Sequence, residues 1–278
     1  MDNNRKLIYS REQKELDLKP EIKAGIESSE TDLNTQISSS FSLKGYEKKD
    51  GMFSYSLFCV ISGGEKKEKN FLRELIIHRN LRSLRVAFLS KENQGLQPYQ
   101  MQDRWSEIRR SGIFEFEGQS FRLDSVDKVY LLSDVDEFYD QLVKILCNQD
   151  ENDVGEWIIS NPCFEIWLYY CFKNEPKVDL VCLESLSTAE RSQKMKELGN
   201  VVVDGGLNPI HAFERMANGI SHSIEHYARD DKNIPILYAT EMHKMAQCLL
   251  ETMNRSTREY DEFIRSKREW RETMRSGK

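Results

Sequence analysis

The sequence predicts an α/β protein, in which a largely parallel β-sheet lies between helices and is followed by a helical C-terminal part. Three observations support this fold class. Between residues 52 and 172, short runs of aromatic and β-branched residues alternate with segments of helical periodicity. After about residue 185 the spacing of apolar residues is helical only. The alternating order implies parallel strands, because a helix carries the chain back across the sheet between them.

Each predicted strand is a short apolar run bounded by polar or turn-forming residues. The first, residues 52–61 (MFSYSLFCVI), is followed by a Ser-Gly-Gly turn. Three more core strands are expected, at residues 84–89, 128–133 and 157–159. A hairpin is predicted over residues 114–121, with Gly118 in its turn.

Apolar residues spaced three and four apart predict helices between and after these strands. The expected helices cover residues 65–80, 100–111, 138–146, 162–172, 209–228 and 240–254. In the aromatic-rich fourth helix, Pro162 would occupy the first turn, and Ser160 or Asn161 would cap it.

Composition divides the chain into four predicted parts. Residues 1–50 carry 9 basic and 10 acidic side chains and few large apolar ones, so we expect a polar N-terminal arm. Residues 51–184 would form the α/β core, and residues 185–254 the helical C-terminal part of the same domain. Residues 255–278 carry 8 basic and 5 acidic side chains, a net charge of +3, and are expected to form a basic, aromatic tail helix.

The overall composition excludes several classes of protein. The chain carries 40 basic and 46 acidic side chains, a net charge of −6, which argues against a generally basic nucleic-acid binder but allows a nuclease with a small basic groove. The apolar runs are too short to cross a bilayer, and no signal segment opens the sequence. The six cysteines lack CxxC spacing, so neither a zinc ribbon nor a disulfide framework is expected. We therefore expect a cytoplasmic protein.

An acidic pair follows the strand predicted at residues 128–133. In an extended segment, residues two apart point to the same side, so Asp134 and Asp136 would face one another at a strand end. Ligands of parallel sheets bind at the carboxyl ends of the strands, and paired carboxylates suit Mg²⁺. The alternative is a solvated acidic turn, with Asp136 capping the next helix and Glu137 in its first turn.

A glycine turn follows the first strand. Gly63 and Gly64 permit close approach of a ligand, and the following helix start offers N–H groups to a phosphate. Lys66 and Lys67 come next and are candidates for phosphate contact. Neither of the glycine-rich nucleotide-binding motifs is complete, so a plain strand-to-helix turn with exposed charges explains this segment equally well.

Two further features have both a functional and a structural interpretation. Glu165 lies among aromatic residues, where a carboxylate is costly unless it is paired or binds a metal. It is a candidate metal ligand or, alternatively, the capping-box partner of Asn161. His222 and His226 are spaced as a ligand pair on one helix face, but without an accompanying HExxH motif we favour an ordinary surface or core pair.

These features together, in this order, resemble the RloB-like family, a variant of the Toprim fold found in nucleases and phage-defence proteins. The strongest similarity is SNPCFEIWLYYCF, residues 160–172. The acidic strand end, YLLSDVDEF at residues 130–138, is similar to the Toprim acidic pair, and GGEKKEKNF at residues 63–71 is similar to the start of the family. The resemblance covers roughly residues 55–250.

The resemblance implies a phosphodiesterase that depends on Mg²⁺ or Mn²⁺, with residues 51–184 as its catalytic core. It implies that Asp134 and Asp136 hold one ion and that Glu68 and Glu165 complete the cluster or hold a second one. Most Toprim proteins carry a glutamate where this chain has Gly63. Glu65 or Glu68 would have to replace it, and we prefer Glu68, which matches a glutamate of the family's own motif.

The resemblance also implies partners. RloB-like proteins resemble the second component of two-part antiviral defence systems whose first component is an ATPase, and this chain has no P-loop of its own. The expected function is an effector nuclease that cuts RNA, such as tRNA, or DNA. Homo-oligomers are compatible with this role. The alternative is a non-catalytic module that binds the ATPase or nucleic acid.

The predicted tail helix has three open uses. Its aromatic and apolar residues, interleaved with six arginines, are Tyr260, Phe263, Ile264 and Trp270. They could stack on unpaired bases, dock on a partner protein, or pack on the chain itself. Because the net charge is only +3, we favour docking on the partner over nucleic-acid binding.

Overall fold

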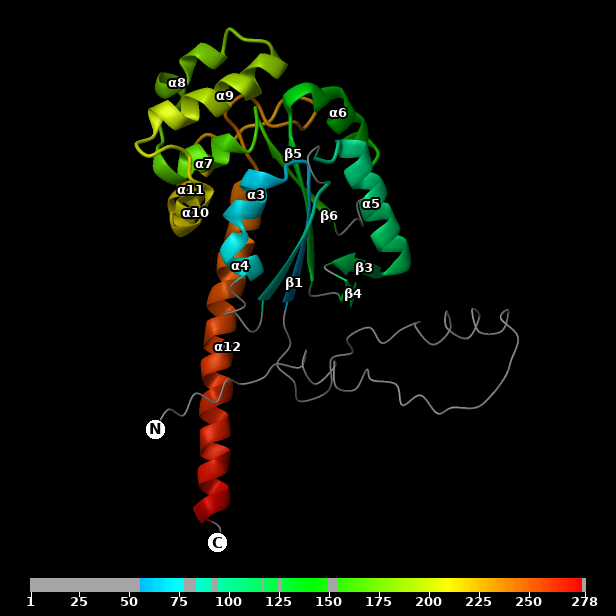
Figure 1. Cartoon of the computed structure of the whole chain (residues 1–278), viewed down its shortest axis with the longest axis vertical. Helices are drawn as coiled ribbons and strands as arrows, with labels where there is room; N and C mark the ends of the chain where they lie inside the picture. Colours follow the sequence, from blue (N-terminus) through cyan, green and yellow to red (C-terminus); the bar gives the residue numbers. More distant parts are fainter. Residues whose placement is uncertain are drawn as a thin grey trace, which may run out of the picture. The chain divides into compact units, whose positions relative to one another are not determined.

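The computed structural model describes residues 56–77, 84–91, 95–116, 118–124, 127–149 and 155–276. The predicted N-terminal arm lies outside these ranges. Within them, four parallel strands form one sheet in the order β2-β1-β5-β6. Their bounds are Ser56–Ser62 for β1, Leu84–Leu89 for β2, Lys128–Asp134 for β5 and Gly155–Ser160 for β6. The predicted α/β class is confirmed (Figure 1).

The sheet is buried on both faces, and its residues alternate between two hydrophobic clusters. In β5, Tyr130 and Leu132 belong to one cluster, and Val129 and Leu131 belong to the other. The same alternation runs through β1 and β6. These strands therefore read as nearly continuous apolar runs in the sequence, because each has a helical layer on either side.

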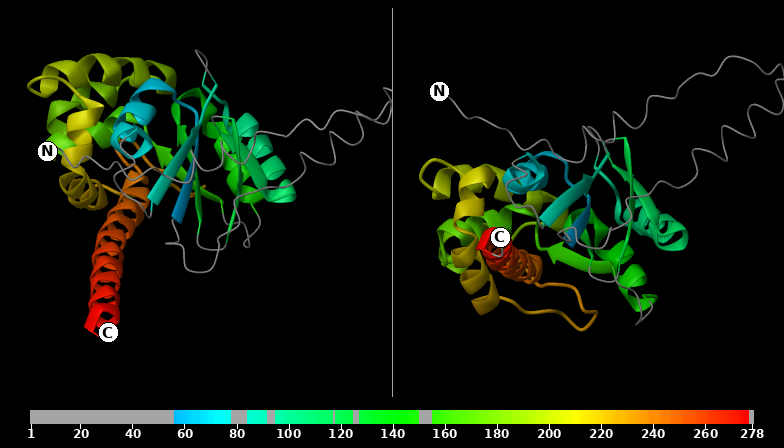
Figure 2. Two further views of the ribbon diagram at one scale, coloured as in Figure 1. Left: turned by 60° about the horizontal axis from the view of Figure 1, so that its bottom comes forward. Right: turned by 90° about the horizontal axis from the view of Figure 1, so that it is seen from below.

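Helices cover both faces (Figure 2). The face of Val129 and Leu131 packs against α5 (Pro98–Ser111), α6 (Tyr139–Cys147) and the predicted hairpin, which consists of β3 (Ile113–Phe116) and β4 (Gln119–Arg122). Gly118 has the positive φ of 70° that the hairpin turn requires. The other face belongs to a hydrophobic cluster that it shares with helices from the N-terminal and C-terminal parts of the chain, whose bounds are α3 Lys66–Phe71, α4 Arg73–Ile77, α7 Glu165–Phe172, α9 Thr188–Val202, α10 Pro209–Glu214, α11 Met216–Glu225 and α12 Met242–Ser276. A further short helix, α8 (Pro176–Asp179), follows α7.

Three predicted helices differ from the observed ones. The helix expected at residues 65–80 is two short helices, α3 and α4, that meet at Leu72. The helix expected at residues 209–228 is likewise divided, at Arg215. The aromatic helix begins at Glu165, and neither Ser160 nor Asn161 caps it, because the backbone at residues 161–164 makes a separate turn before the helix. The expected role of Pro162 in the first turn is therefore wrong.

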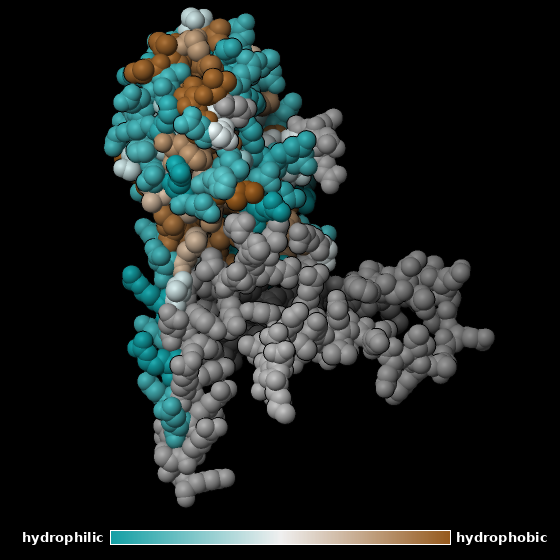
Figure 3. Space-filling view, turned by 60° about the vertical axis from the view of Figure 1, so that its left-hand side comes forward, coloured by the Kyte–Doolittle hydropathy of each residue, from teal (hydrophilic) through white to brown (hydrophobic). Residues whose placement is uncertain are grey.

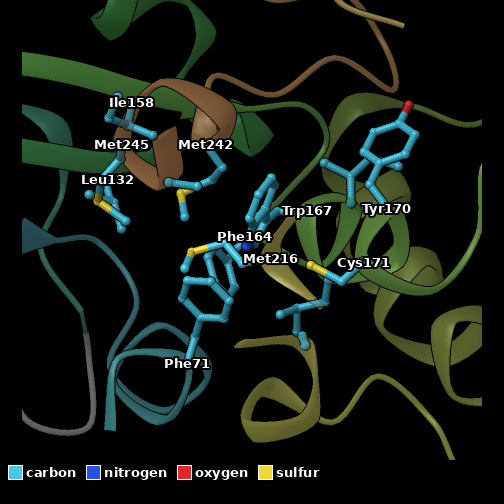
Figure 4. Close-up of a cluster of buried hydrophobic side chains, with 14 of the residues drawn as sticks. Phe71, Leu132, Ile158, Phe164, Trp167, Tyr170, Cys171, Met216, Met242 and Met245 are labelled. Atoms are coloured by element: carbon cyan, nitrogen blue, oxygen red, sulfur yellow. The ribbon is translucent and has the colours of Figure 1, made fainter. Parts of the chain in front are cut away.

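Helix α12 has 35 residues, which corresponds to a length of about 52 Å. Its first part is a core helix: Met242 and Met245 pack beside Leu132 and Ile158 of the sheet (Figure 4). Beyond Met253 the described side chains are exposed and polar, and they give α12 its hydrophilic edge in Figure 3. The helix continues without a break to Ser276, through most of the predicted tail. The structure describes the backbone there but not the side chains of the tail's aromatic residues.

Two exclusions made from the sequence can be compared with the structure. Among the described residues, no helix combines the length and apolarity needed to span a bilayer. The six cysteines are all free, and Cys59, Cys163 and Cys171 are buried as small core residues. The burial of these three thiols agrees with the interpretation of them as small core residues.

Candidate functional site

The carboxyl ends of the parallel strands meet at one edge of the sheet, where ligands of such sheets bind. Ser62, Asp134 and Ser160 are the last residues of β1, β5 and β6. A small recess, too narrow to admit a water molecule, lies at this edge. Its lining combines sheet residues with side chains from α3, α12 and the residue before α7, namely Glu68, Leu132, Ser133, Asp134, Ile158, Ser160, Phe164 and Met242. Two of these residues, Glu68 and Asp134, carry carboxylates.

Asp134 is held in place at the end of β5. Its Oδ1 accepts a hydrogen bond of 2.8 Å from the backbone N–H of Phe164, which joins the strand end to the start of α7. Burial raises the pKa of Asp134 well above the ordinary value, and the charges of Glu68 and Glu165 raise it further. The carboxyl group is thus oriented, and its surroundings as a whole disfavour its charged form.

Glu68 supplies a second carboxylate from α3. The side chain is buried, with 8% of its surface exposed. It lies against Gly64, where an added Cβ would be 1.9 Å from Oε1 of Glu68. Burial raises the pKa of Glu68 to about 7, and the charge of Glu165 contributes to the shift. A side chain at position 64 would therefore displace the flexible carboxylate end of Glu68.

Glu165, the first residue of α7, is paired with a lysine. Lys67 Nζ lies 2.7 Å from Oε1 of Glu165, and the glutamate side chain is 4% exposed. The expected capping box with Asn161 is wrong, because the Asn161 side chain instead donates a hydrogen bond of 2.7 Å to the carbonyl of Pro235. The ion pair joins α3 to α7 across the cluster.

Asp136 lies beside the cluster rather than opposite Asp134. β5 ends at Asp134, and Asp136 begins the short 3₁₀ helix η1 (Asp136–Phe138) with a positive φ of 29°. The extended geometry expected for the acidic pair is therefore wrong, and so is the expected capping role of Asp136, because Phe138 precedes α6. Burial and the neighbouring charges of Glu137 and Glu165 raise the pKa of Asp136. A positive φ at a non-glycine residue is uncommon and is often found at functional sites.

The remaining candidates occupy the turn between β1 and α3. Gly63 continues the ladder of β1, since its N–H donates to the carbonyl of Leu132 at 2.9 Å. A Cβ at Gly63 would lie 3.1 Å from the carbonyl oxygen of Leu96, so the neighbouring loop leaves little room for a side chain there. Glu65 is the N-cap residue of α3 and is half-buried, whereas Lys66 is exposed. Of the two glutamates considered, Glu68 is the one that lies in the recess with Asp134.

Residues 228–241 lie between α11 and α12 and brace the edge strand β6. The Ser160 and Thr240 hydroxyls are 2.8 Å apart, and the two residues form an antiparallel bridge. Glu241 makes two hydrogen bonds to the backbone of Ile159. Its N–H donates to the Ile159 carbonyl at 2.9 Å, and its Oε2 accepts from the Ile159 N–H at 3.1 Å. This bracing positions the turn between β6 and α7, which carries Glu165.

Two elements of the site were not identified from the sequence. One is Glu241, a carboxylate only 1% exposed, whose charge is balanced by Arg229 and Lys244. The other is Lys196 of α9, whose charge acts on the carboxylates of Asp134 and Glu68. Glu241 stands alone in a largely apolar stretch and matches no motif, and Lys196 lies in a polar helix with another lysine two positions away, so no local pattern marked either residue.

The histidine pair has a structural role. Nδ1 of His222 is 2.7 Å from the carbonyl of Tyr170, and Nε2 of His226 is 3.0 Å from the carbonyl of Asn174. Both rings therefore tie α11 to the end of α7. The favoured interpretation, an ordinary pair rather than metal ligands, agrees with these contacts.

The chemistry of the cluster is that of hard oxygen donors. Glu68, Asp134 and Glu165 supply carboxylates only, which are the donors that Mg²⁺ and Mn²⁺ prefer. Within the described ranges, no group of three His, Cys, Asp or Glu side chains is spaced to hold a metal ion. One of the three carboxylates, that of Glu165, is already paired with the ammonium group of Lys67. The donor set fits a divalent ion in type, although the described side chains are not already spaced as a site for one.

The comparisons with known proteins identify a family. The RloB-like protein family matches residues 58–262, which is more than half of the 278-residue chain. Comparisons with curated proteins and with solved structures gave no match. The matched range includes the carboxylate cluster and the strand ends that carry it. The chain therefore belongs to the RloB-like protein family.

Proposed function

We propose that this chain is a divalent-metal-dependent nuclease with a Toprim-like site, acting as the effector of an antiviral defence system. The observation that carries the proposal is the carboxylate cluster at the carboxyl edge of the sheet. Glu68 and Asp134 share one recess, both have raised pKa values, and the charge of Glu165 acts on both. Partly buried carboxylates that repel one another are stable only when a proton or a cation offsets them, and catalytic sites commonly use this arrangement.

Mg²⁺ or Mn²⁺ is the cofactor we propose for this cluster. Asp134 and Glu68 would hold it, with Glu165 joining after release from Lys67 and Asp136 approaching from η1. When bound, such an ion supplies Lewis-acid activation of a phosphoryl oxygen and of water. The chain contributes orientation: the N–H of Phe164 holds Asp134, and the packing of α3 against Gly64 holds Glu68. Lys67, once displaced, becomes available to a substrate phosphate.

Cleavage of labelled RNA and DNA oligonucleotides tests the proposal directly. The purified protein should cut at least one of them when Mg²⁺ or Mn²⁺ is present and neither when EDTA is added. The two substrates decide between RNA and DNA, which share the phosphodiester chemistry. Binding of either oligonucleotide without cleavage under any divalent ion would instead favour the second candidate, a non-catalytic module, for which the missing glutamate at Gly63 is the supporting observation.

Replacing Gly64 with alanine tests the placement of Glu68. Gly64 does not have a positive φ, so alanine is compatible with the backbone. The added Cβ would displace the flexible end of Glu68, whose Cδ would otherwise lie 2.2 Å away. We expect cleavage to fall about 10- to 100-fold, because an ångström-scale misplacement has effects of this size. Thermal denaturation should show little loss of stability, and unchanged cleavage would show that the position of Glu68 is unimportant.

The proposed partner is the ATPase component of the defence system, and the distal part of α12 is its proposed docking segment. A protein ending at Asn254 keeps the buried residues Met242, Met245 and Leu249 that anchor the helix. It should therefore fold and retain cleavage activity, while co-purification with the ATPase should fall at least about tenfold, as expected for loss of an anchoring helix. Undiminished co-purification, or a truncated protein that fails to fold, would contradict the docking role.

A further inference from the structure

The ion pair between Lys67 and Glu165 lies beside the carboxylate recess. Lys67 Nζ is 2.7 Å from Oε1 of Glu165, although the two residues are 98 positions apart in the sequence. Glu68, which follows Lys67 in α3, lines the recess, and so does Phe164, which precedes Glu165 at the start of α7. The pair therefore joins the two segments that close the recess.

This pair is within electrostatic range of the carboxylates in the recess. The charge of Glu165 raises the pKa of both Glu68 and Asp134, and the charge of Lys67 lowers the pKa of Glu68. Carboxylates that lie close together repel one another unless a cation or a proton offsets them. The ammonium group of Lys67 supplies such a cation, at ion-pair distance from Glu165.

The two partners differ in their exposure to solvent. The side chain of Glu165 is 4% exposed, whereas that of Lys67 is 36% exposed. Lysine carries its charge on a flexible stem and can extend it into water. When the pair opens, Lys67 is therefore the partner that moves. Glu165 is then a buried carboxylate without a counter-ion, which is unfavourable until another cation replaces the lysine.

Opening of the pair leaves α3 and α7 in contact. Phe71, four residues after Lys67 in α3, packs edge-to-face against Phe164 and Trp167, with ring centroids 6.0 and 5.9 Å apart (Figure 4). All three rings are buried. These apolar contacts do not depend on the charges, so one cation can replace another through a side-chain movement alone.

We propose that Lys67 is an autoinhibitory counter-ion of this site, which holds Glu165 when no metal is bound and competes with a divalent cation for that carboxylate. The inference rests on the proposed metal-dependent function and adds a control to it. Metal affinity is held below the value that the carboxylates alone would give, because an ammonium group must be displaced first. The recess admits no water molecule while the pair is closed, which agrees with a site that is shut until a cation enters.

Mn²⁺ binding tests this competition independently of cleavage. The wild type, Lys67→Met, Glu165→Gln and the double variant form a cycle, and the free ion is measured by its electron paramagnetic resonance signal. We expect Lys67→Met to bind Mn²⁺ about fivefold more tightly than the wild type, the effect expected from an ion pair with one partly exposed partner. The gain should disappear in the Glu165→Gln background. Lys66→Met, at the exposed neighbouring position of α3, is the matched control and should bind like the wild type.

Thermal stability and a charge-conserving variant give two further readouts. In EDTA, Lys67→Met should melt below the wild type, because Glu165 loses its counter-ion, and saturating Mn²⁺ should remove the difference. Lys67→Arg should bind Mn²⁺ more weakly than the wild type, because a guanidinium group holds a carboxylate through two hydrogen bonds. A pair that only joins α3 to α7 would give the same loss of stability with and without Mn²⁺.

The outcomes separate this inference from the proposed nuclease. Unchanged Mn²⁺ affinity in Lys67→Met would overturn the competition, and so would a gain that persists in the Glu165→Gln background or a protein that binds no Mn²⁺. Cleavage of the RNA and DNA oligonucleotides by the wild type is measured in parallel. Tighter Mn²⁺ binding in Lys67→Met without any cleavage would leave the competition standing and refute the nuclease. Cleavage by the wild type, with unchanged Mn²⁺ affinity in Lys67→Met, would support the nuclease and refute the competition.

Discussion

Replacing Asp134 with asparagine should abolish cleavage, reducing it by more than about 100-fold. Substitutions around metal ligands commonly cost 10- to 100-fold, and Asp134 is one of the two carboxylates that we propose as holding the ion. Asparagine keeps an oxygen that can accept the 2.8 Å hydrogen bond from Phe164, so the junction between β5 and α7 should persist. Asp134→Ala should be equally inactive but leaves that buried N–H without its acceptor.

The same substitution should make the protein more stable. The pKa of Asp134 is raised in the folded protein, so its ionised form opposes folding at neutral pH. Removing the charge relieves repulsion from Glu68 and Glu165, and the melting temperature of Asp134→Asn at pH 7 should exceed that of the wild type. Glu137→Gln is the control, because Glu137 is exposed in the same turn. A folded Asp134→Asn protein with full activity would remove Asp134 from the site.

Replacing Glu241 with alanine should cause the largest loss of stability among the substitutions considered. Its carboxylate accepts hydrogen bonds from the Ile159 N–H at 3.1 Å and the Tyr227 hydroxyl at 2.8 Å, and it pairs with Arg229 and Lys244. Removal leaves a buried N–H unpaired at the end of β6. We expect the free energy of unfolding to fall by about 2–4 kcal/mol. This is less than the loss of a fully buried ion pair would cost, because the side chains of Arg229 and Lys244 are about one-third exposed.

The pH dependence gives a second signature of Glu241. Burial alone would raise its pKa, but Lys244 and Arg229 lower the pKa below the ordinary value. A carboxylate with a depressed pKa stabilises the folded state above its unfolded pKa of about 4.3 and loses this contribution as the pH falls. The difference in stability between the wild type and Glu241→Gln should therefore be constant near neutral pH and shrink below about pH 4.

A surface pair supplies the control for this series. Glu197 is 56% exposed and pairs with Lys194 at 3.0 Å, so Glu197→Ala should change the free energy of unfolding by less than about 0.5 kcal/mol. Chemical denaturation of the variants measures all of these effects. Equal stabilities of Glu241→Ala and Glu197→Ala would show that the bracing of β6 by residues 228–241 is unimportant.

The architecture of the sheet could be predicted from the sequence because it depends on local periodicity. The alternation of Val129 and Leu131 with Tyr130 and Leu132 between two hydrophobic clusters requires apolar residues at every position, and such runs are visible without any tertiary information. The strand predicted at residues 84–89 coincides with β2 for the same reason. The position of Asp134 at the carboxyl edge follows directly, since it ends the apolar run of β5.

Helix boundaries near the site were harder to predict, because contacts remote in sequence decide them. Pro162 and Asn161 suggested the start of a helix, but Asn161 is held by the carbonyl of Pro235, and α7 begins only at Glu165. The break at Leu72, between α3 and α4, likewise interrupts a helical pattern that continues in the sequence. Tertiary hydrogen bonds and packing override local propensity at such positions.

The sequence alone determined the fold class, the sheet edge and the candidate carboxylates at its strand ends, because residue spacing and strand order dictate all three. Only the tertiary structure decided which charges meet there. Lys67 and Glu165 are 98 positions apart, and Ile159 and Glu241 are 82 apart, so no local pattern links the members of either pair. The same holds for Lys196, which is carried to the cluster by α9. Electrostatic interactions act through space, and the folded chain alone brings these groups within range of one another.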